Sequence, residues 1–404
     1  MVGSHASITF ESVNQVESFP RLPGTGLRRS ETVVESHSEF KSAESGRFFL
    51  PGPTEVHPDV LAAQLRPMIG HRGAEIESLM ARLQEGLRLL FRTERAVFVS
   101  TSSATGLMEA GVRNGVRGGL LALVNGAFSE RFARIAEASA IPVERLETPG
   151  DRPHDPADVV ERLRSGRFDT VSVVHSETST GMLNPVRELA EAVREFDDVL
   201  LLVDSVSGLG GAPLLTDEWG LDFALTGSQK ALALPPGLAF GVASERMAAR
   251  AAAAPGKGLY FDLTQHARKL ERLQTPSTPA LSLMYALEVQ LDRIRREGLE
   301  ARWDRHRRMA ERTWAWVDGL REERGLELSV FAPVGYRSPT VTCVALPETH
   351  SGTDVRDRMR ARGYVLATGY GAMKEGAIRI GHMGEHDLAA LERLLGTLEE
   401  VLVE

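Results

Sequence analysis

The chain of 404 residues is short of several residue types, and each shortage excludes a class of structure. Cys343 is the only cysteine, so the chain can form neither an intrachain disulfide nor a metal site built on cysteine, and we assign no metal site. No uninterrupted apolar run approaches the roughly 20 residues of a membrane-spanning helix, so we expect no membrane association. The N-terminus has no basic region followed by an apolar stretch, which indicates no secretory signal and favours the cytoplasm.

Basic residues are outnumbered by acidic ones. The chain has 47 lysines and arginines and 55 aspartates and glutamates. The resulting net charge of −8 argues against a general nucleic-acid-binding protein. Only five of the basic residues are lysines, namely Lys41, Lys230, Lys257, Lys269 and Lys374. The base composition of the gene explains such a shortage in general, so the informative question is what each remaining lysine does.

Length and composition together favour a globular protein of two domains. Apolar residues make up 42% and charged residues 25%, and 404 residues exceed the usual size of one domain. Residues 1–46 are rich in Ser, Glu and Gly without a sustained period, so we expect a flexible N-terminal extension there. A large domain with an N-terminal segment is expected over residues 47–285, and a small C-terminal domain over residues 286–404.

Short apolar runs alternate with helical stretches through the expected large domain. Several of these runs are apolar throughout rather than alternating, as strands are when both faces of their sheet are covered. This β-α-β rhythm predicts an α/β fold with a mostly parallel, doubly wound sheet and right-handed connections. The expected strands are 96–99, 120–124, 170–174, 199–203 and 223–225, and the expected helices are 71–91, 128–140, 156–164 and 186–196.

The pattern changes near residue 285. Two long helices are expected at 282–296 and 301–323, followed by strands at 340–345 and 377–380 and by helices at 355–362 and 388–402. The arginines and glutamates of the second long helix fit a solvated face with i,i+4 pairs. These elements predict a smaller α+β domain.

Lys230 is the most distinctive residue of the chain. Ligands of open α/β sheets bind at the carboxyl ends of the strands, and Lys230 follows the expected strand 223–225 among small and apolar residues. A lysine that loses water has its ammonium form disfavoured, and its free amine can attack an aldehyde. The alternative is a buried lysine paired with a carboxylate.

Three other strand ends carry groups that suit the same kind of ligand. Asp204 ends an apolar run and can either cap a helix or hold a cation such as a pyridinium nitrogen. The segment 102–106 begins a helix with Ser and Thr hydroxyls and free N–H groups, which suits a phosphate as well as plain capping. Phe128 offers a stacking face or packs in the core. Together with Lys230, these are the parts of a site for pyridoxal 5'-phosphate.

Six segments resemble those of a known family. They are Pro-Gly-Pro-Thr at 51–54, Thr-Ser-Ser-Ala-Thr at 101–105, Glu-Thr-Ser-Thr-Gly at 177–181, Val-Asp-Ser-Val-Ser-Gly at 203–208, Gly-Ser-Gln-Lys-Ala at 227–231 and Ile-Arg-Ile-Gly at 378–381. In this order they resemble the class V aminotransferases, and within them the alanine–glyoxylate and serine–pyruvate aminotransferase group. The resemblance covers about residues 48–402 and implies fold type I of the pyridoxal-phosphate-dependent transferases.

The resemblance implies a role for each matching residue. Lys230 matches the Schiff-base lysine, Asp204 the partner of the pyridine nitrogen, and Arg379 the arginine that binds the substrate carboxylate, which a guanidinium can hold with two hydrogen bonds. The other cofactor contacts that it implies are Phe128 and Val206 on the two ring faces, Thr178 near the ring hydroxyl, and Ser103, Ala104, Thr105 and Gln229 at the phosphate.

The phosphate site carries two further expectations. Tyr260 and Thr278 match residues that reach the phosphate site of a second subunit, which implies a homodimer with a shared active site. Ala104 stands where the family has glycine, and its N–H can still donate to a phosphate if its φ angle is negative.

The function implied is a ping-pong transamination from a small amino acid, alanine or serine, to glyoxylate or pyruvate. Aminotransferases for phosphoserine or aspartate remain alternatives, as do a lyase and a cysteine desulfurase that use the same cofactor. A desulfurase needs a cysteine on a mobile loop, whereas Cys343 falls in an expected strand of the small domain.

The sequence gives less support to two hypotheses outside the pyridoxal-phosphate enzymes. A nicotinamide-dependent dehydrogenase would need a G-x-G-x-x-G pattern, and the pattern that starts at Gly208 fails because its last position is Pro213. A scaffold that has lost its activity would be expected to lack Lys230, Asp204 or Arg379, and the chain keeps all three. His175 and His382 adjoin the site segments, and the sequence leaves open whether they are catalytic or structural.

Overall fold

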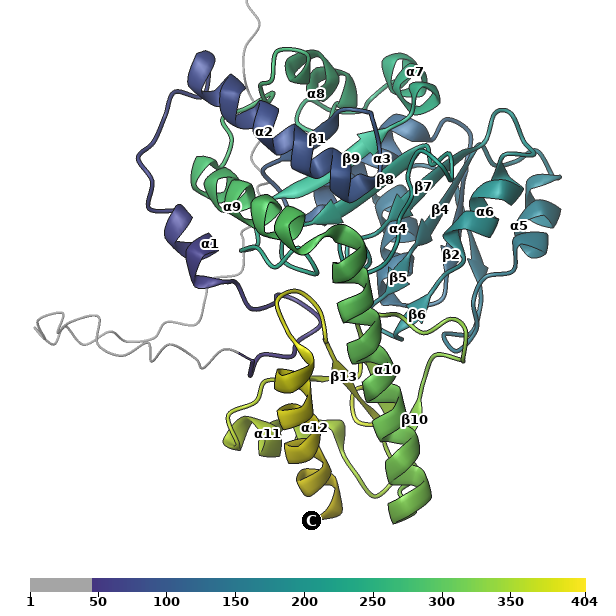
Figure 1. Cartoon of the computed structure of the whole chain (residues 1–404). Helices are drawn as coiled ribbons and strands as arrows, with labels where there is room; N and C mark the ends of the chain where they lie inside the picture. The colour runs from purple at the N-terminus through teal and green to yellow at the C-terminus, as the bar shows by residue number, and fades with distance from the viewer. Residues whose placement is uncertain (1–45) are drawn as a thin grey trace, which may run out of the picture. The chain divides into compact units, whose positions relative to one another are not determined.

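A seven-stranded sheet forms the centre of the larger part of the chain in the computed structural model, which describes residues 46–404 (Figure 1). The strand order is β1-β9-β8-β7-β4-β2-β3, and neighbouring strands are parallel except where β9 lies between β1 and β8. These strands are β1 (Val97–Ser100), β2 (Leu120–Val124), β3 (Val143–Glu147), β4 (Thr170–Val174), β7 (Leu200–Asp204), β8 (Phe223–Gly227) and β9 (Ala239–Ala243). The expected α/β fold with a mostly parallel sheet is confirmed, whereas the expected extension over residues 1–46 falls outside the described residues apart from Gly46.

Two strands of this sheet were not among the expected ones. The edge strand β3 carries the sequence Val-Glu-Arg-Leu-Glu, and none of its residues is fully buried. The antiparallel strand β9 contains Gly241, where a Cβ atom would lie 3.3 Å from side-chain carbons of Leu107 and Phe223. An edge strand with polar residues and a strand interrupted by glycine both lack the continuous apolar run that marks the other strands.

The helices of this part follow the apolar periods of the sequence. In α2 (Ala74–Phe91) the buried residues include Ile76, Leu79, Leu83 and Leu87, which are spaced so that they share one face. The other helices are α1 (Pro58–Ala63), α3 (Ala104–Gly115), α4 (Ala127–Ala138), α5 (Pro156–Leu163), α6 (Val186–Val193), α7 (Glu245–Ala253), α8 (Leu263–Leu270) and α9 (Leu281–Glu297). A two-stranded ribbon, β5 (Ser176–Glu177) with β6 (Met182–Leu183), follows β4.

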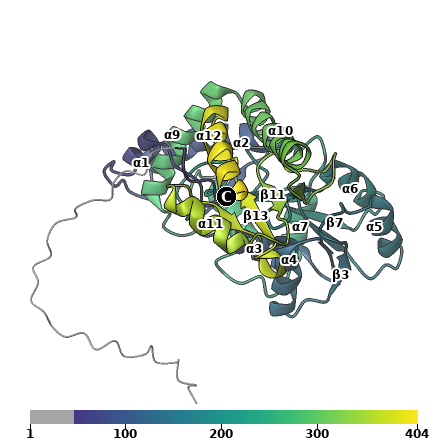
Figure 2. The same ribbon diagram turned by 90° about the horizontal axis from the view of Figure 1, so that it is seen from below.

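A second, antiparallel sheet forms the C-terminal part, with strand order β10-β11-β13-β12. Its strands are β10 (Ser329–Val330), β11 (Thr342–Ala345), β12 (Ala367–Thr368) and β13 (Ala377–Ile380). The helices that pack with it are α10 (Leu299–Arg324), α11 (Gly352–Ala361) and α12 (Leu388–Val403), with a short 3-10 turn at Gly371–Met373. Figure 2 shows α11 and α12 next to each other in the view from below.

The described residues contain two main apolar cores. The core around the large sheet continues through α9 to Leu299, and the core of the C-terminal part begins at Met309 and also takes in Phe49 from the N-terminal segment. The boundary near residue 285 stays a prediction, and these cores indicate that α9 packs with the large sheet. Within residues 46–404 we find no helix that is both long and apolar enough to cross a membrane.

Candidate active site

A cavity of about 270 Å³ lies at the carboxyl ends of the parallel strands, where α3 and α4 begin. The chain reaches it from six separate segments of the sequence, because parallel strands end at the same edge of a sheet. Nine of the twelve site residues predicted from the sequence line it: Ser103, Ala104, Thr105, Phe128, Thr178, Asp204, Val206, Gln229 and Lys230.

Lys230 lies buried just after β8, and both its main chain and its side chain are held by the N-terminal segment. Its Nζ donates a hydrogen bond to the carbonyl oxygen of Pro51, and the Thr54 hydroxyl donates to its main-chain oxygen at 3.0 Å. Gly52 leaves no room for a side chain, because a Cβ atom there would lie 2.3 Å from Cδ of Lys230. Burial and the nearby charge of Arg379 lower the pKa of Lys230 to about 8, so a useful fraction of its amine is neutral near neutral pH.

Asp204 occupies the last position of β7 and is buried. Its Oδ1 accepts a hydrogen bond from the main-chain N–H of Val206 at 2.7 Å. Burial raises the pKa of Asp204 to about 6, although the charges of Arg131 and Lys230 oppose this. The structure begins no helix at Asp204, so capping does not explain this carboxylate. A buried carboxylate that receives one main-chain hydrogen bond is suited to hold a cationic N–H of a ligand.

The N-terminus of α3 presents several unused donors to the cavity. Ser103 is the N-cap residue, and its side chain makes no capping hydrogen bond. Ala104 opens the helix with a negative φ, so the condition stated for its N–H is met. The Thr105 hydroxyl accepts a hydrogen bond from Nη1 of Arg131 at 3.1 Å. A helix N-terminus with free N–H and hydroxyl groups is a binding site for an anion such as a phosphate.

Phe128 is held in place by a buried carboxylate rather than by a capping residue of its own helix. The N-cap of α4 is Gly126, which has no side chain to accept hydrogen bonds. Glu177 takes over this task, because its carboxylate oxygens accept from the N–H groups of Phe128 at 3.2 Å and Ser129 at 2.8 Å. A Cβ atom on Gly126 would lie 2.4 Å from the Glu177 carboxyl carbon, so this arrangement requires glycine.

Arg379 comes from the small sheet and lies beside the cavity rather than in its lining. Its Nε donates to the carbonyl oxygen of Thr368 at 2.9 Å, and its Nη1 donates to that of Thr178 at 3.2 Å. Its guanidinium lies 5.5 Å from the ring centre of Tyr370, and that ring lies 5.7 Å from Phe128. Burial lowers the pKa of Arg379 from its usual value. Its charge acts on Lys230, whereas its expected role toward a substrate carboxylate stays a prediction.

Tyr260 and Thr278 are not brought to the cavity within this chain. They line a separate small pocket together with Thr101, and the Tyr260 hydroxyl donates to the Thr101 carbonyl oxygen at 2.8 Å. Tyr260 is 45% exposed, so it is available to a second molecule. Their expected role at the phosphate of a second subunit stays a prediction.

Sequence reasoning missed several residues of the cavity: Gly52, Pro53, Met108, Arg131, Val174, Ser176 and Ser207. A signal existed for three of them, since Gly52 and Pro53 lie in the first of the six recognised segments and Ser207 lies in the fourth. Arg131 follows Phe128 by three residues, which places both on one face of α4. That spacing could have indicated Arg131.

The two histidines next to the site segments have structural surroundings. His175 lies 2.9 Å from the Ser205 hydroxyl, and His382 lies 2.8 Å from the Thr342 hydroxyl. Burial lowers the pKa of each of them to about 4, so both are neutral near neutral pH. Neither lines the cavity.

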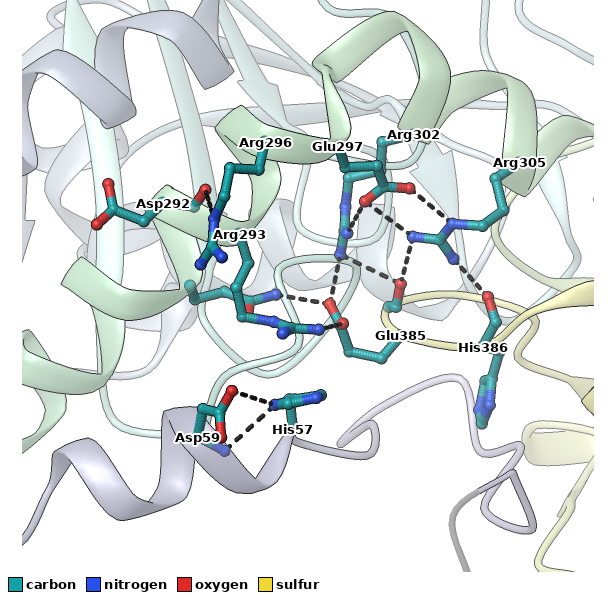
Figure 3. Close-up of polar contacts among 12 residues, drawn as sticks. His57, Asp59, Asp292, Arg293, Arg296, Glu297, Arg302, Arg305, Glu385 and His386 are labelled. Carbon is teal, nitrogen blue, oxygen red and sulfur yellow. Dashed lines mark hydrogen bonds and ion pairs between the residues drawn. The ribbon is translucent and has the colours of Figure 1, made fainter.

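A buried ion cluster holds the segment after Lys230 against the segment after Arg379 (Figure 3). Arg302 of α10 is 1% exposed and donates to the carbonyl oxygens of Ala231 at 2.8 Å and Gly384 at 3.1 Å. Its guanidinium also forms ion pairs with Glu297 at 2.7 Å and Glu385 at 3.3 Å. The same cluster includes Arg293, which pairs with Glu385, and Arg305, which pairs with Glu297.

Comparison with known proteins places this chain in a family. The family model described as aminotransferase class-V matches residues 58–379, so the chain belongs to the class V aminotransferases and is an enzyme of that class. The chain is 39% identical to an uncharacterized aminotransferase of Methanocaldococcus jannaschii, over 83% of this chain and 87% of that protein. It is 34% identical to the protein named soluble hydrogenase, small subunit, of Synechococcus sp., over 89% of this chain and 94% of that protein.

Further matches define the group within the family. The crystal structure of an alanine–glyoxylate aminotransferase from Nostoc sp. is 30% identical with a TM-score of 0.82, covering 88% of this chain and 95% of that one. Relatives at 31–32% identity over 83–88% of this chain are aminotransferases named for glyoxylate together with ureidoglycine, aspartate, alanine or serine. The protein is therefore an aminotransferase of the glyoxylate aminotransferase group.

Proposed function

We propose that this enzyme uses pyridoxal 5'-phosphate to move an amino group from a small amino acid, alanine or serine, to glyoxylate or pyruvate. The observation that carries the proposal is Lys230, a buried lysine whose pKa is lowered to about 8 and whose amine lies in the same cavity as Asp204. A lysine with these properties is suited to covalent chemistry with an aldehyde.

The cavity fits the proposed cofactor by the chemistry of its groups. Asp204 faces it with a buried carboxylate that suits a protonated pyridine nitrogen, and Phe128 and Val206 supply apolar faces for a ring. The N-terminus of α3 supplies N–H and hydroxyl donors that suit the phosphate. When bound, the cofactor supplies an electron sink for the substrate carbon that loses a proton.

The residues of the chain then have separate tasks. The Lys230 amine would take the proton from the α-carbon of the substrate and deliver one to the former aldehyde carbon of the cofactor, because its pKa lies near the working pH. The Asp204 carboxylate would hold the ring nitrogen protonated, and Arg379 would bind the substrate carboxylate with its guanidinium. Lys230 lies in the large domain expected over residues 47–285, and Arg379 lies in the small domain expected over residues 286–404. Substrate binding would therefore involve both domains.

The amino acceptor and the amino donor are proposed on different evidence. The relatives named for glyoxylate support glyoxylate as the acceptor, whereas they differ in their amino donors. Alanine and serine are proposed as donors from the resemblance of the six segments, and phosphoserine and aspartate are the alternatives.

A cysteine desulfurase activity on the same fold receives little support from the geometry. Cys343 is buried in β11, and burial raises the pKa of its thiol to about 12. The nucleophile of such chemistry is a thiolate, which a buried thiol with this pKa does not provide.

A homodimer with a shared active site belongs to the same proposal. The exposed apolar side chains Leu65, Met68 and Leu259, together with Tyr260, support a contact with a second copy of the chain. In that arrangement Tyr260 and Thr278 would serve the phosphate site of the other subunit. The cytoplasmic location is retained as a prediction.

The purified enzyme tests the proposal directly. Wild type should bind pyridoxal phosphate covalently at Lys230, which borohydride reduction and peptide mass spectrometry detect, and Lys230→Ala should lose both this product and turnover. A matrix of donors (alanine, serine, aspartate, phosphoserine) against acceptors (glyoxylate, pyruvate, 2-oxoglutarate) should give its highest kcat/KM for alanine or serine with glyoxylate or pyruvate. Turnover by Lys230→Ala at the wild-type rate would reject the mechanism.

A further inference from the structure

Arg131 is a cation in the cavity that the proposed chemistry has not yet used. It lies on α4 three residues after Phe128, and its guanidinium carbon is 4.9 Å from the centre of the Phe128 ring. Its Nη1 donates to the Thr105 hydroxyl at 3.1 Å, at the N-terminus of α3. Arg131 therefore connects the ring side of the cavity with its phosphate side.

The charge balance of the cavity supports a role for this cation. A phosphate monoester carries a charge of about −1.5 to −2 at pH 7. The groups assigned to it so far, Ser103, Ala104, Thr105 and Gln229, are all neutral, and a helix N-terminus supplies only about half a positive charge. Among the described residues, the cavity has two cationic side chains in its lining, Lys230 and Arg131. Lys230 is committed to the aldehyde end of the cofactor.

The hydrogen bond between Arg131 and Thr105 also orients the donors. Because the Thr105 hydroxyl accepts from Arg131, its own hydrogen is free to point toward an anion at the helix N-terminus. Among the described residues, Arg131 forms no ion pair with a carboxylate. By contrast, Arg145 forms ion pairs with Glu130 and Glu137, and the charge of Arg134 also lowers the pKa of Glu137. Arg131 lines the cavity beside the N-terminus of α3, and a guanidinium can make two hydrogen bonds with a phosphate.

We propose that Arg131 binds the phosphate group of the cofactor and is its principal cationic contact within the chain. This proposal rests on the proposed function, since it assumes that pyridoxal phosphate is the ligand. It predicts that Arg131 discriminates between a phosphorylated and an unphosphorylated pyridoxal. A residue that only supported the cavity wall would affect both ligands equally.

The test compares binding of pyridoxal 5'-phosphate with binding of pyridoxal to the cofactor-free protein, followed by absorbance and by quenching of intrinsic fluorescence. Arg131→Gln should weaken pyridoxal phosphate by about tenfold to a hundredfold and leave pyridoxal within about twofold of wild type. Arg131→Lys should recover part of the loss, because it restores the charge without the planar fork. Arg134→Gln, on the exposed side of the same helix, is the matched control and should bind both ligands as wild type does.

The possible results separate a failure of the role proposed for Arg131 from a failure of the proposed function. Inorganic phosphate should compete with pyridoxal phosphate for wild type more strongly than for Arg131→Gln. An equal loss for both ligands, or no loss for either, would overturn the role of Arg131. If wild type bound neither ligand at Lys230, the proposed function itself would fail, whatever the variant did. Thermal unfolding of the cofactor-free variants shows whether Arg131→Gln is folded.

Discussion

The carboxylate of Glu177 accepts a hydrogen bond from the main-chain N–H of Phe128, a residue 49 positions earlier in the chain. The same carboxylate accepts from the N–H and hydroxyl groups of Ser129 and Ser179, so a fully buried charge is surrounded by donors. This contact fixes the first turn of α4 at the edge of the cavity. It makes Glu177 a positioning residue for the aromatic ring of Phe128 that lines the cavity.

Glu177→Ala should therefore destabilise the protein. The substitution leaves the N–H groups of Phe128 and Ser129 buried without an acceptor, which should cost about 3 kcal/mol of unfolding free energy. Urea unfolding of the cofactor-free protein measures this. Glu191→Ala removes a carboxylate from an exposed i,i+4 pair and is the control, with an expected cost below about 0.5 kcal/mol. A loss of the same small size for Glu177→Ala would contradict the capping role.

Asp204 should make stability depend on pH in the acidic range. Its pKa in the folded protein is about 6, above the ordinary value of 3.8, so the folded state binds more protons between these values. Its contribution to stability is therefore full below pH 4 and is lost as the pH rises through 6. In the cofactor-free protein the unfolding free energy of wild type relative to Asp204→Asn should fall by about 3 kcal/mol between pH 4 and pH 7. A difference that is independent of pH would show that Asp204 keeps an ordinary pKa.

Gly52 should be necessary for the position of Lys230. Gly52→Ala places a Cβ atom against Cδ of Lys230, and the φ angle of +99° adds backbone strain. Gly73 has nearly the same φ, +100°, but has open space around it, so Gly73→Ala carries the strain without the contact. We expect pyridoxal to attach to Lys230 at least about tenfold more slowly in Gly52→Ala, and at the wild-type rate in Gly73→Ala. Equal rates in both variants would mean that the lysine moves aside without consequence.

Arg302 should be required for folding stability. Arg302→Met leaves Glu297 and Glu385 without this partner and removes the Arg302 donor from the carbonyl oxygens of Ala231 and Gly384, of which Gly384 keeps its hydrogen bond from Arg305. Breaking a buried pair in this way should cost about 3–5 kcal/mol in urea unfolding. The control Arg307→Met removes an exposed arginine from the same helix and should cost less than about 1 kcal/mol. Similar losses for the two variants would show that the buried cluster contributes no more than a surface pair.

The sequence by itself determined the α/β architecture and nine of the residues that line the cavity. Apolar runs marked β2, β4, β7 and β8, because strands buried on both faces must be apolar throughout. Lys230 and Asp204 could be predicted for the same reason, since each polar residue follows such a run and the ends of parallel strands meet at one edge. Local patterns carried this information, and the six recognised segments added the family.

The tertiary structure decided which distant groups serve these residues. Glu177 as the cap of α4, Arg131 beside Thr105, and Arg302 behind the segment of Lys230 are contacts between residues 26 to 71 positions apart. No periodicity in the sequence encodes such a pairing, because it depends on how strands and helices cross in space. Burial also belongs to the tertiary structure, and burial is what lowers the pKa of Lys230 and raises that of Asp204.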